Sequence, residues 1–390
     1  MFRTTNVFFT IIGCLLVIGF CAIYSSGFAL SVGINSDSML VNHCVYVTIA
    51  MICFYVASKI DYHFYKKIGT PIFIISGLLL LAVLLPGISR EVYGARRWIM
   101  IGGMSIQPTE IAKVASVLYL ANILCQKQDQ LSYFWKGFVG ASLSVGVIII
   151  LIAAEPDLGN AILLSSTVLL MLQISGFKWK YFSVLAPVIV IAMIVMLSKF
   201  DHIMNRINGF LHPEELKASS GYQAYMAVTS IGSGGLTGAG IGEGQIKLHY
   251  LPFVNNDFIT SLIGEEAGLL GMGVLLLLFS GLMFYGLKIA INAKELYGTL
   301  IAFGIIFMTG LQAVFHIGVN LSLLPTKGIS LPFISYGGTS LIVLMASMGV
   351  VYNIGLQGRP KSEAKELGAK DVAYRVISLR KKNDEPLVVK

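Results

Sequence analysis

The sequence contains few charged residues. Only 12% of its 390 residues are Asp, Glu, Lys or Arg, whereas soluble domains typically carry about 25%. The deficit extends along the whole chain, because apolar runs of about twenty residues recur, each long enough to cross about 30 Å of hydrocarbon. This excludes a soluble globular protein and predicts an all-α polytopic membrane protein.

The sequence also lacks the signatures of several chemistries. The cysteines all lie in apolar runs, where cysteine behaves as a small hydrophobic residue, so a disulfide framework is not expected. No HExxH, CxxC or GxxxxGK[ST] pattern is present, and no two histidines have metal-ligand spacing, which excludes the common zinc protease and P-loop ATPase motifs. No basic face is interleaved with aromatic residues, so nucleic acid is not an expected partner.

Ten apolar runs predict ten transmembrane helices, and an even number of spans places both termini on the same side. Nineteen of the twenty-eight Lys and Arg residues fall in the termini and joining segments of that side. Because positive residues collect in the cytoplasm, we expect both termini to be cytoplasmic and the first span to be retained. The predicted spans are 7–25, 40–58, 69–86, 107–125, 137–154, 158–175, 181–199, 260–287, 298–322 and 333–355.

This topology divides the chain into a membrane domain, 1–355, and a cytoplasmic polar tail, 356–390. Residues 200–259 form a large extracellular loop between the seventh and eighth helices, and a loop of this length usually has a function. Its glycine-rich sequence, IGSGGLTGAGIGEG, fails the GxGxxG spacing. A flexible or closely packed backbone is therefore expected there rather than a nucleotide loop.

Ionisable residues occur near the outer ends of the predicted spans, where they are energetically costly and usually functional. Glu110 and Lys113 lie one helical turn apart, so they form either an ion pair that lets the helix sit in lipid or part of an internal polar cavity. Arg96 and Arg97 would stand at the mouth of such a cavity. Guanidinium groups bind phosphate bidentately, so these arginines either anchor phospholipids or hold a specific diphosphate.

Two further clusters lie on the outer side. Asp257 stands where the long loop enters the eighth span, either as a helix cap or as a general base. Of Glu265 and Glu266, which point about 100° apart on a helix, at most one can share its face. Residues 318–340, GVNLSLLPTKGISLPFISYGGTS, contain Lys327 and break the helical pattern. Non-helical backbone at this depth is tolerated only beside protein or water, which indicates a cavity opening outward.

Taken together, the motifs GARRWI, QPTEIAK, EPDLGNA, DFI with IGEEAGLLG, and GVN with LLPTKGISLPFISYGGTS resemble those of the SEDS family, the shape, elongation, division and sporulation proteins of RodA, FtsW and SpoVE type. The resemblance implies a peptidoglycan glycosyltransferase that polymerises lipid II outside the cytoplasmic membrane of a bacterium, together with a class B penicillin-binding transpeptidase. It also implies that Asp257 is the essential loop aspartate. The candidate substrate-binding residues are Arg96, Arg97, Glu110, Lys113, Lys247 and Lys327.

The chain departs from the family pattern in places. LPFVNNDFI replaces a stretch that usually resembles LPEAHTDFI, with Phe253 for the acid and Asn255-Asn256 for His-Thr. Glu155 and Asn160 replace residues that are more usual around PDLGT. The expected protein is therefore a divergent member of the family.

The expected reaction is an inverting transfer, in which the 4-hydroxyl of an incoming GlcNAc attacks the anomeric carbon of a lipid-linked MurNAc. One carboxylate suffices as general base, and cations stabilise the departing lipid diphosphate. A divalent cation, Mg²⁺ or Mn²⁺, could share that role, but the sequence does not locate a metal site. Two other functions remain open: a transporter (flippase) of lipid II, and a non-catalytic scaffold of a cell-wall synthase complex.

Overall fold

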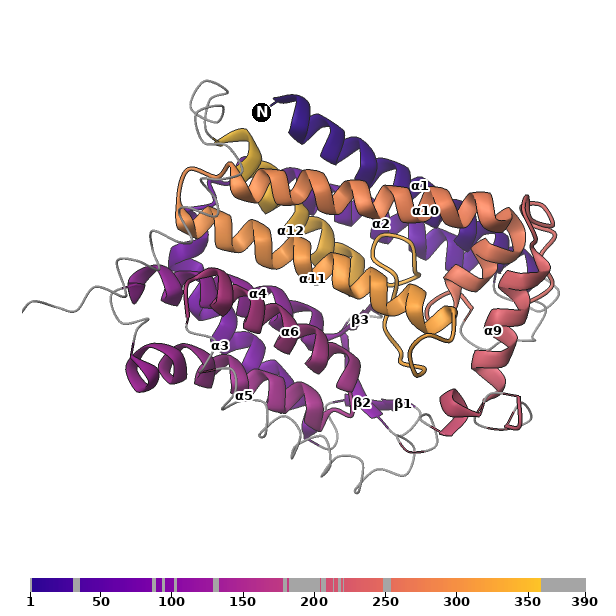
Figure 1. The fold of residues 1–390 in the computed structure, drawn as a ribbon, viewed down its shortest axis with the longest axis horizontal. Coiled ribbons are helices and arrows are strands. Elements are labelled where there is room, and N and C mark those ends of the chain that lie inside the picture. The colour runs from indigo at the N-terminus through magenta and orange to yellow at the C-terminus, as the bar shows by residue number, and fades with distance from the viewer. Residues whose placement is uncertain are drawn as a thin grey trace, which may run out of the picture.

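A computed structural model describes the chain over residues 2–30, 36–85, 89–92, 95–101, 104–128, 133–177, 181, 204, 208–212, 214–216, 219, 221–247 and 254–358. The predicted seventh span beyond Tyr181 and the tail beyond residue 358 lie outside these residues. Within them the structure is mostly helical, with helices running side by side along the long axis of the molecule (Figure 1).

The other nine predicted spans all coincide with helices. Residues 222–233 of the long loop form an additional short helix, and a π-helical turn precedes the fifth span. The elements are α1 (Phe2–Leu30), α2 (Ser36–Lys59), α3 (Phe64–Leu84), α4 (Pro108–Gln126), η2 (Phe134–Val139), α5 (Gly140–Ala154), α6 (Leu158–Ile174), α9 (Tyr222–Ser233), α10 (Ile259–Ile291), α11 (Leu296–Asn320) and α12 (Gly338–Leu356). The last span begins later than predicted, since residues 333–337 are not helical.

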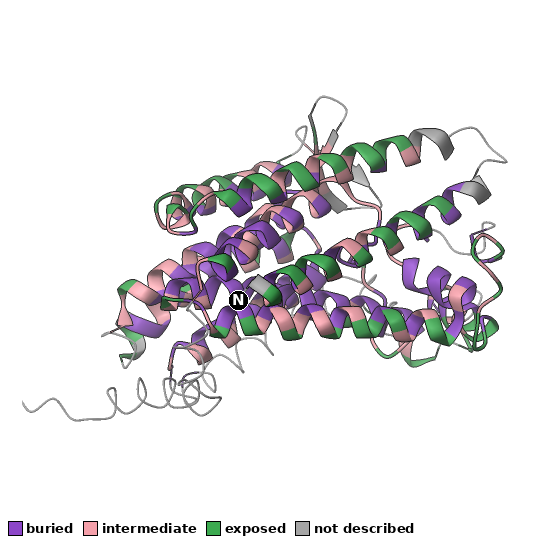
Figure 2. Ribbon diagram, turned by 90° about the horizontal axis from the view of Figure 1, so that it is seen from above, coloured by how far each residue is buried: buried purple, intermediate pink, exposed green. Residues whose placement is uncertain are grey.

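Seven helices of the described chain are long and apolar enough to cross a membrane: α1, α2, α3, α5 with the end of η2, α10, α11 and α12. α6 is apolar but has only 17 residues. Figure 2 shows exposed residues along the outer faces of the helices and buried residues between them. Many of the exposed residues are large and apolar, including Val17, Ile52 and Leu277, as expected for surfaces in contact with lipid. The chain is a multi-pass membrane protein.

The all-α prediction is wrong for the segment that precedes α4. Strands β1 (Ser89–Val92), β2 (Ala95–Ile101) and β3 (Met104–Ile106) form an antiparallel sheet in the order β1-β2-β3. Trp98 and Ile99 suit a strand, since aromatic and β-branched residues are enriched in sheets. Pairing between the strands also satisfies backbone groups that have no helix to join. The sheet places Arg97 beside the cavity described below.

Helix α11 lies at the centre of the helical assembly and packs against α4, α6, α10 and α12. Two of its glycines permit close approach. A Cβ atom at Gly304 would lie 2.7 Å from a methyl of Val117 in α4, and one at Gly310 would lie 2.0 Å from the sulfur of Met283 in α10. Both distances are shorter than van der Waals contact, so these helices approach as they do because α11 has glycine there.

The glycine-rich part of the long loop packs directly on α10, which is interrupted at Gly268 (φ 62°). The amides of Ala239 and Gly240 donate to the carbonyls of Glu265 and Glu266, at 2.9 and 3.1 Å. Beyond the break, the amides of Leu269 and Leu270 donate to the carbonyls of Gly235 and Leu236, at 2.9 and 3.1 Å. Of the two alternatives expected for this segment, a flexible or a closely packed backbone, the structure shows the closely packed one.

Candidate active site

Lys113 lies at the centre of a buried polar network that joins three helices. Its side chain, 1% exposed, points from α4 toward α6 and α11. The Nζ atom donates to Glu110 Oε1 at 2.9 Å, to Asn160 Oδ1 at 2.8 Å and to Gln312 Oε1 at 3.4 Å. The ion pair expected from the spacing of Glu110 and Lys113 is therefore present, but it lies inside the protein rather than against lipid.

The network continues into the turn before α6. Asp157 is the N-cap of that helix and accepts hydrogen bonds from the amide of Asn160 at 3.2 Å and from its Nδ2 at 2.8 Å. Because Asn160 also accepts from Lys113 through Oδ1, one side chain connects the cap of α6 to the buried ammonium. Asn160, which departs from the family pattern, is thus integrated into the network.

The segment between α11 and α12 folds back over the start of α10. It is held there by hydrogen bonds to the backbone carbonyl oxygens of the two residues before Asp257. The amide of Tyr336 donates to the carbonyl of Asn255 at 2.9 Å, and Ser335 Oγ donates to the carbonyl of Asn256 at 2.7 Å. These bonds hold residues 255–257 against residues 331–336.

Asn320, the last residue of α11, supports Asp257 from the other side. Its Nδ2 donates to the carbonyl of Asp257 at 3.0 Å, and its Oδ1 accepts from the amide and the hydroxyl of Ser261 at 3.2 and 2.8 Å. The side chain is fully buried. Asn320 therefore caps the first turn of α10 from a neighbouring helix and holds the backbone of Asp257 at the same time.

This arrangement bears on the alternative role of Asp257 as a helix cap. The N-cap position of α10 is Phe258, which makes no side-chain capping bond, and the helix begins at Ile259. Asp257 is therefore not the N-cap residue. It is half-buried, and a Cβ atom at Gly328 would lie 3.4 Å from its Oδ2, so its carboxylate faces the segment that carries Lys327.

A cavity of about 440 Å³ lies between these elements. It is bounded by the sheet, the starts of α4, α6, α9 and α12, the end of α11 and the segments before α10 and α12. Its lining is Arg97, Trp98, Gln107, Glu110, Asn160, Gln223, Asn256, Asp257, Phe258, Gln312, Thr326, Lys327, Gly328, Ile329, Ser330, Tyr336, Gly337 and Ser340. A single cavity thus collects the predicted Arg97, Glu110, Asp257 and Lys327, which come from four separate parts of the sequence.

Arg97 enters the cavity from β2, and the turn between α5 and α6 orients its guanidinium. Nε donates to the carbonyl of Glu155 at 3.0 Å, and an Nη2 hydrogen is donated to the carbonyl of Pro156. A guanidinium has five N–H donors, and these two are used within the described part of the chain. The group is therefore fixed in position while further donors can face a ligand.

Lys327 contributes the second cation. Burial lowers the pKa of its ammonium group, and the charge of Asp157 partly opposes that shift. Its Nζ lies 5.7 Å from the centre of the Phe315 ring. A desolvated ammonium favours an anionic ligand, because a nearby negative charge restores the stability of its charged form.

Two predicted site residues are placed differently. Lys247 pairs with Glu266 at 2.7 Å and donates to Ser25 Oγ at 2.9 Å, away from the cavity lining. It joins the long loop to α1 and α10, so a contact with substrate finds no support in this arrangement. Arg96 lies in β2, but its side chain falls outside the described part of the structure and its role stays a prediction.

Glu265 and Glu266 have separate structural roles. Glu265 accepts from the amides of Gln245 and Ile246 at 2.8 and 3.0 Å, and Glu266 binds Lys247. Neither lines the cavity with Asp257. The prediction that at most one of them shares the face of Asp257 agrees with this arrangement.

Sequence reasoning missed several residues that build the site. Asn320, Gln312 and Ser335 are polar residues inside the predicted spans 298–322 and 333–355, and that position was the available signal. Gln312 links Lys113 to the segment before α12 by donating to the carbonyl of Ser330 at 2.9 Å. Their importance arises from contacts between distant helices, which the spacing of residues along the sequence does not reveal.

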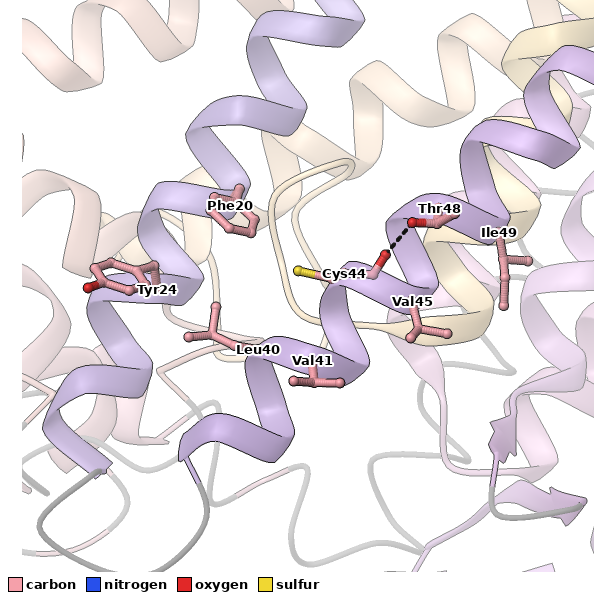
Figure 3. Close-up of a pocket in the computed structure, with 8 residues that line it drawn as sticks. All are labelled: Phe20, Tyr24, Leu40, Val41, Cys44, Val45, Thr48 and Ile49. Atoms are coloured by element: carbon pink, nitrogen blue, oxygen red, sulfur yellow. Dashed lines mark hydrogen bonds between the residues drawn. The ribbon is translucent and has the colours of Figure 1, made fainter.

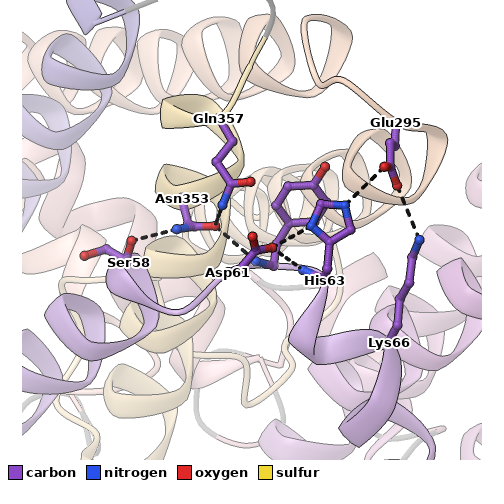
Figure 4. A network of polar contacts seen from close by, with 8 residues as sticks. Ser58, Asp61, His63, Lys66, Glu295, Asn353 and Gln357 are labelled. Atoms are coloured by element: carbon purple, nitrogen blue, oxygen red, sulfur yellow. Dashed lines mark hydrogen bonds and ion pairs between the residues drawn. The ribbon is translucent and has the colours of Figure 1, made fainter.

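Two other polar or hollow regions do not resemble a reaction site. An apolar groove between α1 and α2 has no Asp, Glu, His, Lys or Arg in its lining, which is Phe20, Tyr24, Leu40, Val41, Cys44, Val45, Thr48 and Ile49 (Figure 3). At the opposite end of α10, His63 lies between Asp61 and Glu295, and Glu295 also pairs with Lys66 at 3.3 Å (Figure 4). This second cluster joins the turns after α2 and α10.

The comparison with known proteins agrees with this geometry. The family described as cell cycle protein, FtsW/RodA/SpoVE, matches residues 5–359. The chain belongs to this family. A probable peptidoglycan glycosyltransferase FtsW of Geobacter sp. (strain M18) is 39% identical over 315 residues, covering 81% of this chain and 86% of the relative. Stage V sporulation protein E of Bacillus subtilis is 34% identical and covers 88% of this chain and 95% of the relative.

Solved structures support the FtsW/RodA/SpoVE fold. A chain from a peptidoglycan synthase complex that coordinates polymerization and crosslinking superposes with a TM-score of 0.75, at 24% identity, covering 90% of this chain and 96% of that one. The rod shape determining protein RodA of Thermus thermophilus superposes with a TM-score of 0.64, at 23% identity, covering 91% and 97%. These similarities place the described helices in the arrangement of the family.

Glu155 leads to a prediction about pH. It is fully buried, Thr109 donates to its Oε2 at 3.1 Å, and its Oε1 has no hydrogen-bond partner within the described residues. Burial raises its pKa to about 8 from 4.5, while the bond from Thr109 opposes the shift. The carboxyl is therefore neutral at pH 7 in the folded protein and ionised in the unfolded one. Folding stability is then greatest below pH 4.5 and falls as the pH rises toward 8, by at most about 1.4 kcal/mol per pH unit.

Glu155→Gln should remove this dependence, because an amide has nearly the same shape as a neutral carboxyl. The melting temperature of the purified variant should exceed that of the wild type by an amount that grows between pH 5 and pH 8. Thermal unfolding followed at several pH values measures the difference. A difference that stays constant over this range would show that Glu155 is ionised in the fold.

Proposed function

We propose that this chain is a peptidoglycan glycosyltransferase that polymerises lipid II, with the cavity around Asp257 as its active site. The observation that carries the proposal is that the carboxylate of Asp257 lines the same cavity as two cations, Arg97 and Lys327. The other carboxylate of the lining, Glu110, is already paired with Lys113. Relatives with 35–39% identity are named probable peptidoglycan glycosyltransferase FtsW, which supports the same reaction.

In the proposed reaction, a sugar hydroxyl of one substrate attacks the anomeric carbon of a second, lipid-linked sugar. The new C–O bond forms as the bond between the anomeric carbon and the diphosphate oxygen breaks, with inversion at that carbon. The hydroxyl proton passes to the carboxylate of Asp257, and the bonding electron pair leaves with the lipid diphosphate. One carboxylate suffices because no covalent sugar–enzyme intermediate forms.

Arg97 and Lys327 stabilise the leaving group in this scheme. Negative charge builds on the diphosphate as the bond breaks, and cations fixed in advance stabilise that charge without reorganising. Arg97 is fixed by the carbonyls of residues 155 and 156, and the partly desolvated Lys327 gains from a neighbouring anion. Glu110 and Lys113 act behind them by holding α4, α6 and α11 together.

The described residues contain no group of three or more His, Cys, Asp or Glu that could hold a metal ion by themselves. A Mg²⁺ or Mn²⁺ ion at this site would be held by Asp257 together with diphosphate oxygens and water, as is common for Mg²⁺. When bound, such an ion would add positive charge beside the leaving group. The roles of Asp257, Arg97 and Lys327 are argued without it.

The proposed topology has ten spans, both termini in the cytoplasm and the cavity facing outward. It is supported by the distribution of Lys and Arg and by the nine helices that coincide with predicted spans. In a variant without native cysteines, a membrane-impermeant maleimide should label Glu215→Cys in intact cells and leave His63→Cys unlabelled until the membrane is opened. Labelling of His63→Cys in intact cells would reverse the orientation.

The proposed partner is a class B penicillin-binding transpeptidase. A structurally similar chain belongs to a peptidoglycan synthase complex that coordinates polymerization and crosslinking, and coupling of the two reactions would need such a partner here. Polymerisation measured with the purified chain alone and with the transpeptidase should show a higher rate in the complex. An equal rate would make the partner unnecessary for polymerisation.

Asp257→Asn should abolish polymerisation while leaving the fold intact. The amide has nearly the same size but cannot accept the proton, and general-base catalysis is typically worth about 10²- to 10⁴-fold in rate. The measurement is lipid II polymerisation by the purified variant, with lipid II binding and melting temperature as further readouts. Asp61→Asn, at the opposite end of α10, is the matched control and should polymerise normally.

This experiment also separates the alternative functions. A transporter or a scaffold would tolerate asparagine at position 257, because neither needs a proton acceptor there. Polymerisation at the wild-type rate by Asp257→Asn would therefore remove the proposed mechanism. No polymerisation by the wild type, alone or with its transpeptidase, would favour the scaffold.

Arg97→Ala should reduce polymerisation by about 10- to 100-fold, because a hydrogen bond to a charged group contributes about 1.5–3 kcal/mol. Arg97→Lys should recover only part of the rate, since it keeps the charge but loses the planar fork that binds phosphate. Steady-state polymerisation against lipid II concentration measures both variants. Lys66→Ala, which removes a cation far from the cavity, should behave as the wild type, and normal rates for both Arg97 variants would place the diphosphate elsewhere.

A further inference from the structure

Two large apolar side chains of the glycine-rich loop are exposed although they belong to an extramembrane segment. Leu236 is 70% exposed and Ile241 is 73% exposed, and both follow glycines. Single exposed leucines are common on soluble surfaces and need no explanation. Leu236 and Ile241 lie within a few residues of each other. Their loop is hydrogen-bonded to α10, so the position of α10 in the membrane sets the position of the loop.

The length of α10 locates the membrane surface along it. The helix has 33 residues, or about 50 Å at 1.5 Å per residue, whereas the hydrocarbon layer is about 30 Å thick and needs about 20 residues. Lys288, in the last turn of the helix, marks the far edge, since lysine prefers the interface. Counting about 20 residues back from Lys288 reaches Leu269, directly after the break at Gly268.

Exposure along α10 changes at the same point. Residues 259–266 are all buried under protein. Beyond the break, Leu269, Leu270, Val274 and Leu277 are 63%, 65%, 50% and 73% exposed. The part of α10 after Gly268 is therefore the lipid-facing part, and its exposed surface begins at Leu269.

The glycine-rich loop is attached where this lipid-facing surface begins. The carbonyls of Gly235 and Leu236 accept from the amides of Leu269 and Leu270, and the amide of Gly240 donates to the carbonyl of Glu266. A Cβ atom at Gly238 would lie 2.1 Å from the carbonyl oxygen of Glu266, so the loop rests on α10 through its backbone. Leu236 is thereby held beside Leu270, and Ile241 directly follows Gly240, which is bonded to Glu266 just before the break, so both lie near the level of the membrane surface.

We infer that residues 235–241 form a membrane-docking loop that inserts Leu236 and Ile241 into the outer part of the lipid bilayer beside α10. The occupant of this surface is lipid because the loop is hydrogen-bonded to α10 at residues 266, 269 and 270, where the exposed apolar face of the helix begins. The polar neighbours Thr237 and Glu243 are also exposed, which suits an interface where apolar side chains enter lipid and polar ones stay in water. This inference requires α10 to cross a bilayer and is independent of the proposed reaction.

Docking has a consequence for the site. The loop continues to Lys247, which joins it to α10 through Glu266 and to α1 through Ser25. Helix α9 directly precedes the loop and carries Gln223 into the cavity. Insertion of Leu236 and Ile241 therefore fixes the height of one cavity wall relative to the membrane surface, where a lipid-linked ligand presents its head group.

The experiment is a spin-label accessibility measurement on the full-length chain in nanodiscs of phosphatidylethanolamine and phosphatidylglycerol. In a background with the five native cysteines replaced by alanine, nitroxide labels are attached to Leu236→Cys and Ile241→Cys. Two controls bracket the result. Leu277→Cys reports lipid, and Glu215→Cys, whose side chain is 79% exposed, reports water.

Labels at 236 and 241 should collide often with oxygen and rarely with a water-soluble nickel complex, as the label at 277 does. Frequent collision with the nickel complex, as at 215, would show that the loop lies in water and overturn the inference. Rare collision with both reagents would show that protein covers the loop, from a second copy or from the chain itself, and would also overturn it. If one of the two cysteine variants fails to fold, the other decides the result by the same criteria.

Discussion

The buried ammonium group of Lys113 is the contact on which the cavity depends. Removing a charge from water costs several kcal/mol unless it is paired and hydrogen-bonded, and here Glu110, Asn160 and Gln312 supply the carboxylate and the two amide oxygens. Each partner lies on a different helix or turn of the assembly, so the bonds that compensate the charge also fix α4, α6 and α11 relative to one another. Replacing one partner would leave the ammonium group of Lys113 with fewer hydrogen bonds and would weaken the packing of α4, α6 and α11 beside the cavity.

Asp257 depends on backbone contacts in a comparable way. The segment before α12 binds the carbonyl oxygens of residues 255 and 256, and Asn320 binds the carbonyl of Asp257 itself. Carbonyl oxygens are present whatever the side chain. This accounts for the tolerance of Asn255-Asn256 in a stretch where the family usually has His-Thr, because the bonds that position the aspartate do not use those side chains.

The outer part of the molecule is organised around the break in α10. Before Gly268 the helix is buried, with α9 and the glycine-rich loop packed on it, and after Gly268 one apolar face of the helix is exposed. The loop follows the helix closely because glycine at positions 234, 238 and 268 leaves room for backbone against backbone. The wall of the cavity, the long loop and the membrane surface are therefore joined at one place.

The sequence by itself determined the membrane character and the positions of nine described helices, and it supplied the candidate site residues. These follow from local properties: apolar runs set the spans, and arginine, lysine and aspartate are too costly at the membrane to be placed there without a role. The three-stranded sheet was not predicted, because its strands are short and lie between two helices in a segment that resembles a loop.

Only the tertiary structure decided which of the candidate residues meet. Arg97, Glu110, Asp257 and Lys327 come from four separate segments and share a cavity because α4, α6, α10 and α11 converge on it. Lys247 carries the same charge as Lys327 and is predicted on the same outer side of the membrane. It nevertheless pairs with Glu266 and does not line the cavity. Sequence spacing reports the face of one helix but not the packing of one helix against another, and that packing separates a cation available to a ligand from one neutralised within the fold.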